Sequence, residues 1–188
     1  MSIGNTETTV LGGGCFWCLE AVYEQIEGIE SVTNGYSGGH VDVPTYEQVC
    51  SETTGHAEVV EVVFDFEKIS YKEVIGIFFA IHDPTTLNRQ GYDIGSSYRS
   101  VIFYSNAEQK LIAEETIEDI ERSEIWKNPV VTEITKFEKF YKAEDYHQKY
   151  YMRNTNQPYC QVVISPKLAK IRRDYLTRFK SVTLQENL

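Results

Sequence analysis

Apolar residues along the chain follow two different periods, and these periods predict its secondary structure. Segments in which apolar residues recur every three to four positions predict helices, whereas short β-branched or alternating runs predict strands. The predicted strands are residues 8–11, 58–64, 100–104 and 130–137, and the predicted helices are residues 16–26, 71–82, 107–121, 143–152 and 167–179. Because strands and helices alternate along the chain, we expect an α/β sandwich in which helices pack on a sheet.

Two segments rich in Gly, Tyr and His, residues 34–56 and 82–98, separate the predicted elements. Polar and aromatic loops on a rigid scaffold often carry functional residues, so we expect a site there. The sequence shows no internal repeat, low-complexity tract or Pro- or Ser-rich linker, and its length of 188 residues suits one globular unit. We therefore expect residues 1–188 to form a single domain.

Charge and hydropathy exclude two classes of partner. The formal net charge of -10 argues against nucleic-acid binding, because phosphates need basic partners. No apolar stretch approaches the length of a membrane span, and the polar first residues, 1–7, lack the pattern of a signal peptide. We therefore expect a cytoplasmic protein whose thiols stay reduced. The four cysteines are then candidate catalytic thiols, metal ligands or small buried residues rather than a disulfide framework.

Cys15 is the first candidate for chemistry. It follows three glycines, residues 12–14, which end a predicted strand, and it stands where a helix is predicted to begin. The N-terminus of a helix favours negative charge and lowers the pKa of a thiol placed there. Phe16 and Trp17 would add an apolar wall beside the sulfur. The alternative interpretation is an inert cysteine buried after a glycine turn.

Cys15 and Cys18 also form a C-x-x-C pair, which has three interpretations. The pair is a redox dithiol, half of a zinc site, or a coincidence. Zinc needs two further ligands, and Cys50 and Cys160 stand alone in the sequence, so we expect no metal and no other cofactor. The Gly-Pro pair typical of thioredoxin-like sites is absent between the cysteines. A general C-x-x-C disulfide oxidoreductase remains the alternative function.

Short segments spread over most of the chain carry a more specific pattern. In chain order they are residues 14–17, 35–39, 44–49, 54–58, 82–86, 88–95, 98–100, 143–148 and 157–160. Each segment is weakly informative alone, but together and in this order they are specific. The chain thus resembles the peptide methionine sulfoxide reductase A family, whose members reduce one of the two epimers of methionine sulfoxide.

The resemblance implies a fold, an activity and a set of site residues. The fold is an α+β, ferredoxin-like two-layer sandwich with a mixed sheet, added loops and a C-terminal helix. The activity is reduction of the S epimer of methionine sulfoxide, free or in proteins. The implied site residues are Cys15 as the attacking thiol, Glu58 as the catalytic acid, Tyr46 and Tyr98 as oxygen-binding tyrosines, Phe16 and Trp17 as the pocket for the methyl group, and Asp93 as the polar partner of the substrate backbone.

Elementary chemistry agrees with these roles. The sulfoxide oxygen leaves only if it is protonated, and a carboxylic acid whose pKa is raised by burial can supply that proton. Glu58 begins a β-branched run, so partial burial is expected. Cys15 is left as a sulfenic acid, a second thiol converts it to a disulfide, and the family's usual reductant is thioredoxin. Taken singly, Glu58 would be a surface residue, Tyr46 and Tyr98 scaffold tyrosines, and Asp93 a turn residue.

The second thiol has two candidates. Many family members have Gly at the position of Cys18 and place resolving cysteines in a Gly-rich C-terminal tail, which this chain lacks. Cys18 can reach Cys15 only if Cys15 lies just outside the first helical turn. Cys160 follows the last proline in a predicted loop and could swing inward. We favour Cys18, and we expect Cys50 to be a small core residue and His56 and His147 to be hydrogen-bonded structural residues.

Overall fold

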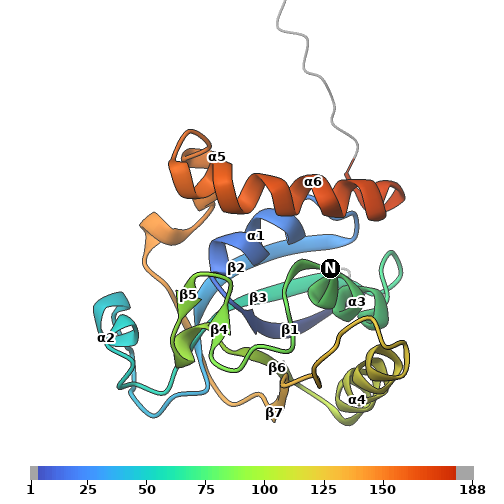
Figure 1. Ribbon diagram of the computed structural model, residues 1–188, viewed down its shortest axis with the longest axis horizontal. Helices are drawn as coiled ribbons and strands as arrows, with labels where there is room; N and C mark the ends of the chain where they lie inside the picture. Colours follow the sequence, from blue (N-terminus) through green and yellow to red (C-terminus); the bar gives the residue numbers. More distant parts are fainter. Residues whose placement is uncertain (1–3, 181–188) are drawn as a thin grey trace, which may run out of the picture.

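A computed structural model of the chain describes residues 4–180, and Figure 1 shows how its elements are arranged. Residues 1–3, part of the polar start discussed above, and residues 181–188 lie outside the description. In the described part of the chain, no helix combines the length and the apolar character needed to cross a bilayer.

The centre of the fold is a curved, mixed sheet. Within residues 4–180 it has six strands, in the order β7-β6-β1-β3-β2-β8. Neighbours are antiparallel except β6 and β7, which are parallel. The strands are β1 (Thr6–Gly13), β2 (Ile29–Ser37), β3 (Ala57–Asp65), β6 (Ser100–Tyr104), β7 (Glu133–Lys136) and β8 (Phe140–Lys142), and a separate hairpin joins β4 (Arg89–Gln90) to β5 (Asp93–Ile94).

Helices cover one face of the sheet, and the short helix α2 (Tyr46–Cys50) lies to one side of it. The other helices are α1 (Phe16–Tyr23), α3 (Tyr71–Ile81), α4 (Ala107–Arg122), α5 (Tyr150–Arg153) and α6 (Ser165–Asp174). Figure 1 shows α6 lying across α1, on the side of α1 away from the sheet. α1 is therefore enclosed between α6 and the strands, which explains why seven of its eight residues are buried.

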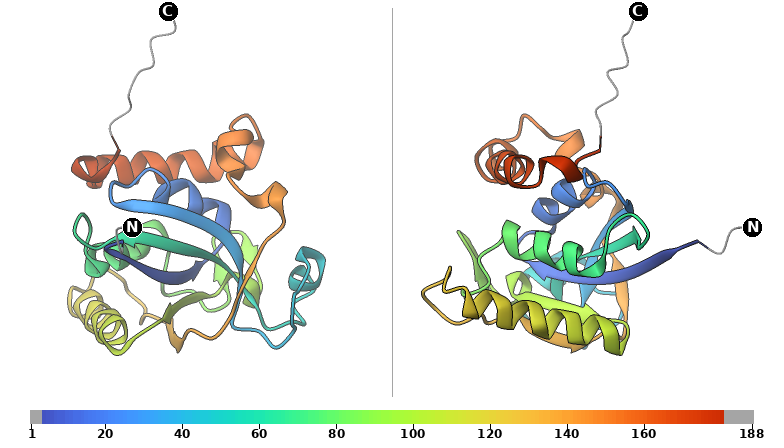
Figure 2. Two further views of the ribbon diagram at one scale, coloured as in Figure 1. Left: turned by 180° about the vertical axis from the view of Figure 1, so that it is seen from behind. Right: turned by 90° about the vertical axis from the view of Figure 1, so that its right-hand side faces the viewer.

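The central strand β3 is buried on both faces. Val60, Val62 and Phe64 pack toward the helices, in the large core cluster. Ala57 and Val59 pack on the opposite face, in a smaller cluster that Phe137 and Phe140 help to cover. The left view of Figure 2 looks onto this second face, with the strands of the sheet in front of α1. A strand buried on both sides carries an almost continuous apolar run, which is why the sequence pattern here alternates poorly.

Most predicted elements are confirmed, and two predictions are wrong. The predicted helix over residues 143–152 is absent: a short 3-10 turn, Asp145–His147, precedes α5. The reason is that Gln148 bonds to both the N–H and the C=O of Asn34 on β2, which holds this segment against the sheet edge. The predicted loop over residues 34–56 contains the end of β2 and all of α2.

Other boundaries shift by a few residues. β7 is shorter than the predicted strand over residues 130–137, and α6 begins at Ser165 and ends at Asp174, before a 3-10 turn at Leu176–Arg178. The prediction that Cys50 is a core residue is wrong, because it is exposed at the end of α2.

A buried carboxylate fixes the segment that follows β8 onto α1. Glu20 of α1 is 1% exposed and accepts the backbone N–H of Lys149 at 2.6 Å and that of Tyr150 at 3.1 Å. Burial raises the pKa of Glu20 to about 6, and the two hydrogen bonds act in the opposite direction. Because this pKa lies below 7, the carboxyl is mainly ionised at neutral pH. The ring of Tyr150 then stacks on Trp17, with centroids 3.7 Å apart and planes 7° from parallel.

We predict that Glu20→Ala lowers the free energy of unfolding by about 2–3 kcal/mol, because two N–H groups lose a charged acceptor. Urea unfolding measures this as a lower midpoint at unchanged slope. Glu27→Ala, at an exposed position just beyond α1, is the control and should change stability by less than about 0.5 kcal/mol. Equal stability of the two variants would contradict the anchoring role of Glu20.

Candidate active site

Cys15 lies at a tight turn between β1 and α1. It is the N-cap residue of α1, with φ -58° and ψ 124°, so it stands just outside the helix. The turn depends on Gly14, whose φ of +91° disfavours any side chain and whose Cβ would lie 2.6 Å from Cγ of Gln90. The predicted position of Cys15 at the helix start is confirmed. Cys15 as a residue is 8% exposed, so the site is nearly closed to solvent.

Glu58 reaches this turn from β3. Its Oε2 accepts the backbone N–H of Phe16 at 3.1 Å, and the residue is only 3% exposed. Burial raises the pKa of Glu58 to about 8, although the hydrogen bond from Phe16 acts in the opposite direction. At neutral pH this group is therefore a protonated carboxylic acid beside a cysteine. The partial burial expected from the sequence becomes nearly complete burial in the fold.

The two cysteines of the C-x-x-C pair share a hydrogen bond, and their pKa values move apart. Burial raises the pKa of Cys15 well above its ordinary value, and the hydrogen bond with Cys18 adds to this shift. The same hydrogen bond lowers the pKa of Cys18 to about 7. The expected lowering of the Cys15 pKa by the helix terminus is thus outweighed by burial. The shifts make Cys18 the more acidic thiol, so its thiolate can take the proton of Cys15, which leaves Cys15 as the thiolate.

Tyr159 connects this pair to Asp93. Its hydroxyl lies 3.9 Å from Sγ of Cys18 and donates to Oδ2 of Asp93 at 2.9 Å. Asp93 comes from β5 and Tyr159 from the segment before a π-helical turn, Cys160–Ile164. Tyr159 is not among the predicted site residues, although the segment 157–160 contains it, because no local pattern distinguishes this tyrosine from a scaffold residue.

Two further hydroxyls approach from separate loops. Tyr46 begins α2, whose start is fixed by a capping box at Thr45, and Tyr98 ends a 3-10 turn, Ser96–Tyr98. Both side chains are partly buried and pack against the core. Burial is the main cause that raises the pKa of each tyrosine. Both hydroxyls therefore stay protonated and can donate hydrogen bonds near Glu58.

An aromatic wall completes the arrangement. Trp17 is partly exposed and is held between the stacked ring of Tyr150 and the edge of Tyr159, with the ring centroids of Trp17 and Tyr159 5.9 Å apart. Phe16 is 1% exposed and lies deeper, 6.1 Å from Trp17 between centroids. The fold thus gathers a thiol pair, a neutral acid, hydroxyl donors and an indole around the start of α1, which suits attack by sulfur on a small polar group carrying an apolar substituent.

Comparison with known proteins agrees with this chemistry. The sequence pattern of the family described as "Peptide methionine sulfoxide reductase" matches residues 7–179. The chain is 57% identical over 174 residues to the peptide methionine sulfoxide reductase MsrA of Saccharolobus solfataricus, an alignment that covers 93% of this chain and 97% of that protein. The chain belongs to the peptide methionine sulfoxide reductase A family.

The fold is also similar to solved structures of a protein from yeast. Mxr1 from Saccharomyces cerevisiae in reduced form has a TM-score of 0.75 and 33% identity, covering 82% of this chain and 89% of that chain. Mxr1 in complex with Trx2 has a TM-score of 0.54 and 25% identity, covering 77% and 84%. The fold is thus a mixed α+β fold with a curled mixed sheet. Membership of this family does not favour the alternative of a general disulfide oxidoreductase.

The two histidines predicted to be structural behave differently in this family member. His56 is hydrogen-bonded, as predicted: its Nδ1 accepts the N–H of Gly39 at 3.0 Å, and its Nε2 lies 2.7 Å from the carbonyl oxygen of Val41. His147 is 1% exposed, yet neither of its ring nitrogens has a hydrogen-bond partner within residues 4–180, so the prediction is wrong for this residue. Its ring packs 4.5 Å from that of Tyr46, between centroids.

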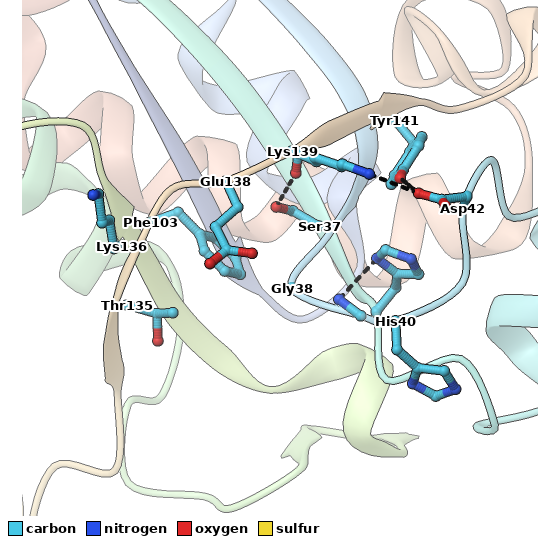
Figure 3. Close-up of a pocket in the computed structure, with 12 residues that line it drawn as sticks. Ser37, Gly38, His40, Asp42, Phe103, Thr135, Lys136, Glu138, Lys139 and Tyr141 are labelled. Atoms are coloured by element: carbon cyan, nitrogen blue, oxygen red, sulfur yellow. Dashed lines mark hydrogen bonds and ion pairs between the residues drawn. The ribbon is translucent and has the colours of Figure 1, made fainter.

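A separate cavity of about 350 Å³ opens near the carboxyl end of β2, and none of its lining residues is a predicted site residue. Figure 3 shows Lys139 and Tyr141 pointing toward Asp42, to which both donate hydrogen bonds. The backbone carbonyl of Lys139 also accepts a hydrogen bond from Ser37. Within residues 4–180, no cluster of three or more His, Cys, Asp or Glu side chains could hold a metal ion.

Proposed function

We propose that this chain reduces the S epimer of methionine sulfoxide, free or in proteins, to methionine through a sulfenic acid on Cys15. The observation that carries the proposal is the neutral Glu58 carboxyl, held at the helix start beside the thiol pair. Family membership and the identity to MsrA of Saccharolobus solfataricus support the same substrate.

In the first step, the Cys15 thiolate attacks the substrate. The oxygen of the sulfoxide takes the proton of Glu58, the S=O bond of the substrate breaks, and the oxygen ends on Cys15 as S–OH while methionine leaves. The proton that Cys15 gave up stays on Cys18, so the charge lost from the pair reappears on Glu58. Glu58 then recovers a proton from water, because its pKa of about 8 lies above neutral pH.

The surrounding side chains orient the substrate. Tyr46 and Tyr98 donate hydrogen bonds to the sulfoxide oxygen, which stabilises the charge that develops there during the step. Trp17, backed by Phe16, supplies the apolar surface for the methyl group. Asp93 accepts a hydrogen bond from the substrate backbone. The positions of these side chains around the start of α1 support the roles that the family resemblance implies.

In the recycling step, Cys18 attacks the sulfenic acid to form a disulfide, which thioredoxin reduces. The free thiol of Cys18 already interacts with that of Cys15, and the N-cap position of Cys15 outside the helix allows the two sulfurs to approach. Cys160 is 0% exposed and begins a π-helical turn whose first carbonyl is held by Ser165, so it would have to leave this turn to react. The structure of Mxr1 in complex with Trx2 supports thioredoxin as the reductant.

The same proposal includes a ferredoxin-like core within a single catalytic domain. Without the short insertions α2, β4 and β5, the elements β1, α1, β2, β3, α3 and β6 have the chain order βαββαβ, and their strands lie in the order β6-β1-β3-β2. This order is that of a split βαβ sandwich, to which β7, β8 and α6 are additions. The match of the family pattern over residues 7–179 supports one domain.

We predict that Cys15→Ser abolishes methionine formation, because a hydroxyl cannot replace the thiolate as nucleophile and oxygen acceptor. Turnover of the separate S and R epimers by the purified protein, followed as methionine released, measures this. The unsubstituted chain should reduce the S epimer and leave the R epimer. Cys50→Ser, at an exposed position, is the control and should retain activity. Full activity of Cys15→Ser would overturn the proposed function.

A second prediction concerns recycling. With thioredoxin as reductant, Cys18→Ser should form one equivalent of methionine and then stop, because its sulfenic acid has no resolving thiol. Cys160→Ser should turn over normally. The opposite pattern would assign resolution to Cys160. Normal turnover by both variants would mean that an external thiol reduces the sulfenic acid directly. Loss of the first equivalent in Cys18→Ser would mean that attack by Cys15 requires Cys18 as its proton acceptor.

A further inference from the structure

A chain of hydrogen-bonding groups leads from Cys18 to the protein surface. Sγ of Cys18 lies 3.9 Å from the hydroxyl oxygen of Tyr159, which lies 2.9 Å from Oδ2 of Asp93. Cys18 is 2% exposed, whereas Asp93 is partly exposed on β5, between Tyr92 at 97% and Ile94 at 70% exposure. The three groups therefore connect a buried thiol to a carboxylate with access to solvent.

The hydrogens along this chain point one way. A tyrosine hydroxyl carries a single hydrogen, and Tyr159 donates it to Oδ2 of Asp93. After the first step Cys18 carries a proton, and the oxygen of Tyr159, whose hydrogen is donated to Asp93, can then only accept from that thiol. The order is Cys18 S–H to Tyr159, and Tyr159 O–H to Asp93. This is the arrangement needed to move a proton outward from the sulfur.

The disulfide-forming step needs such a path. In the reduced protein, the hydrogen bond with Cys15 is the main cause of the lowered pKa of Cys18. Once Cys15 has become a sulfenic acid, that thiol is gone, while the burial that opposes ionisation of Cys18 remains. Cys18 is then a protonated thiol that must lose its proton to attack. Lys167 from α6 and Cys160 also face Cys18, and Glu58 faces both cysteines. The hydroxyl of Tyr159 faces Cys15 as well, and it is the group in contact with both Cys18 and Asp93.

We propose that Tyr159 relays the proton of Cys18 to Asp93 during disulfide formation. The proposal rests on the proposed function, with Cys18 as the resolving thiol. As the S–H bond of Cys18 breaks, Tyr159 takes that hydrogen and passes its own to Asp93. The new S–S bond forms while the S–O bond of Cys15 breaks, and the departing hydroxide takes a proton from Glu58 and leaves as water. Asp93 afterwards releases its proton to solvent, and Glu58 regains one.

Tyr159→Phe tests the relay, with Tyr151→Phe as the matched control, because the hydroxyl of Tyr151 bonds to Ser165 and not to the sulfurs. The reduced protein is mixed with the S epimer in the absence of any reductant. Samples quenched in acid give the methionine formed, the sulfenic acid trapped by dimedone, and the Cys15–Cys18 disulfide by peptide mass mapping. The series is repeated from about pH 6 to about pH 10, across the ordinary pKa of a thiol at about 8.5.

Tyr159→Phe should still form one equivalent of methionine, but its sulfenic acid should accumulate and its disulfide should form about 100-fold more slowly at neutral pH. This deficit should vanish as the pH rises above the pKa of an unassisted thiol, because Cys18 then ionises without help. Tyr151→Phe should match the unsubstituted protein at every pH. Asp93→Asn interrupts the same path at its outer end. Its disulfide should also form slowly at neutral pH and at the normal rate at high pH, whatever the effect of the substitution on substrate binding.

Two results would overturn the relay while leaving the proposed function intact. One is a Tyr159→Phe variant that forms the disulfide at the unsubstituted rate at every pH. The other is a slow variant that high pH does not rescue, which would indicate a structural role. Failure of the proposed function would look different, because the unsubstituted protein would then form no methionine, or would join Cys15 to Cys160.

Discussion

The site depends on one buried hydrogen bond, from the backbone N–H of Phe16 to the carboxyl of Glu58. It joins the first turn of α1 to the central strand of the sheet, and so brings the acid of β3 beside the thiol that precedes α1. Because β3 is covered on both faces, this carboxyl is removed from water and its pKa rises to about 8. The packing that stabilises the fold therefore also keeps the catalytic acid protonated.

Burial sets the protonation of the sulfurs as well. The N-terminus of α1 favours a thiolate on Cys15, but burial outweighs this effect and raises the pKa of Cys15. The interaction between the two thiols lowers the pKa of Cys18 instead. The second cysteine thus serves the first before it acts as a resolving thiol. Tyr159 and Asp93 extend the same network toward solvent, which links the nearly closed site to an outlet for protons.

The sequence carried the local features of the site, and the fold supplied the long-range ones. Gly14 and the β-branched run of β3 predicted the turn at Cys15 and the central strand, because both are properties of short segments. The burial of Glu58 and the contact of Tyr159 with Cys18 join residues far apart in sequence, which no local pattern reports. The predicted helix over residues 143–152 failed for the same reason, since bonds from Gln148 to Asn34 on β2 override its apolar spacing.

The central claim is that burial holds Glu58 as a proton donor, and the pH dependence of a single turnover tests it most directly. Methionine formed by the reduced protein is measured from about pH 6 to about pH 10 for the unsubstituted chain and for Glu58→Gln. The rate of the unsubstituted chain should fall as the pH rises through about 8, where Glu58 loses its proton. Glu58→Gln should be slower by about 10²–10⁴-fold and should lack this fall. An equal rate and an equal pH profile for the two proteins would contradict the account.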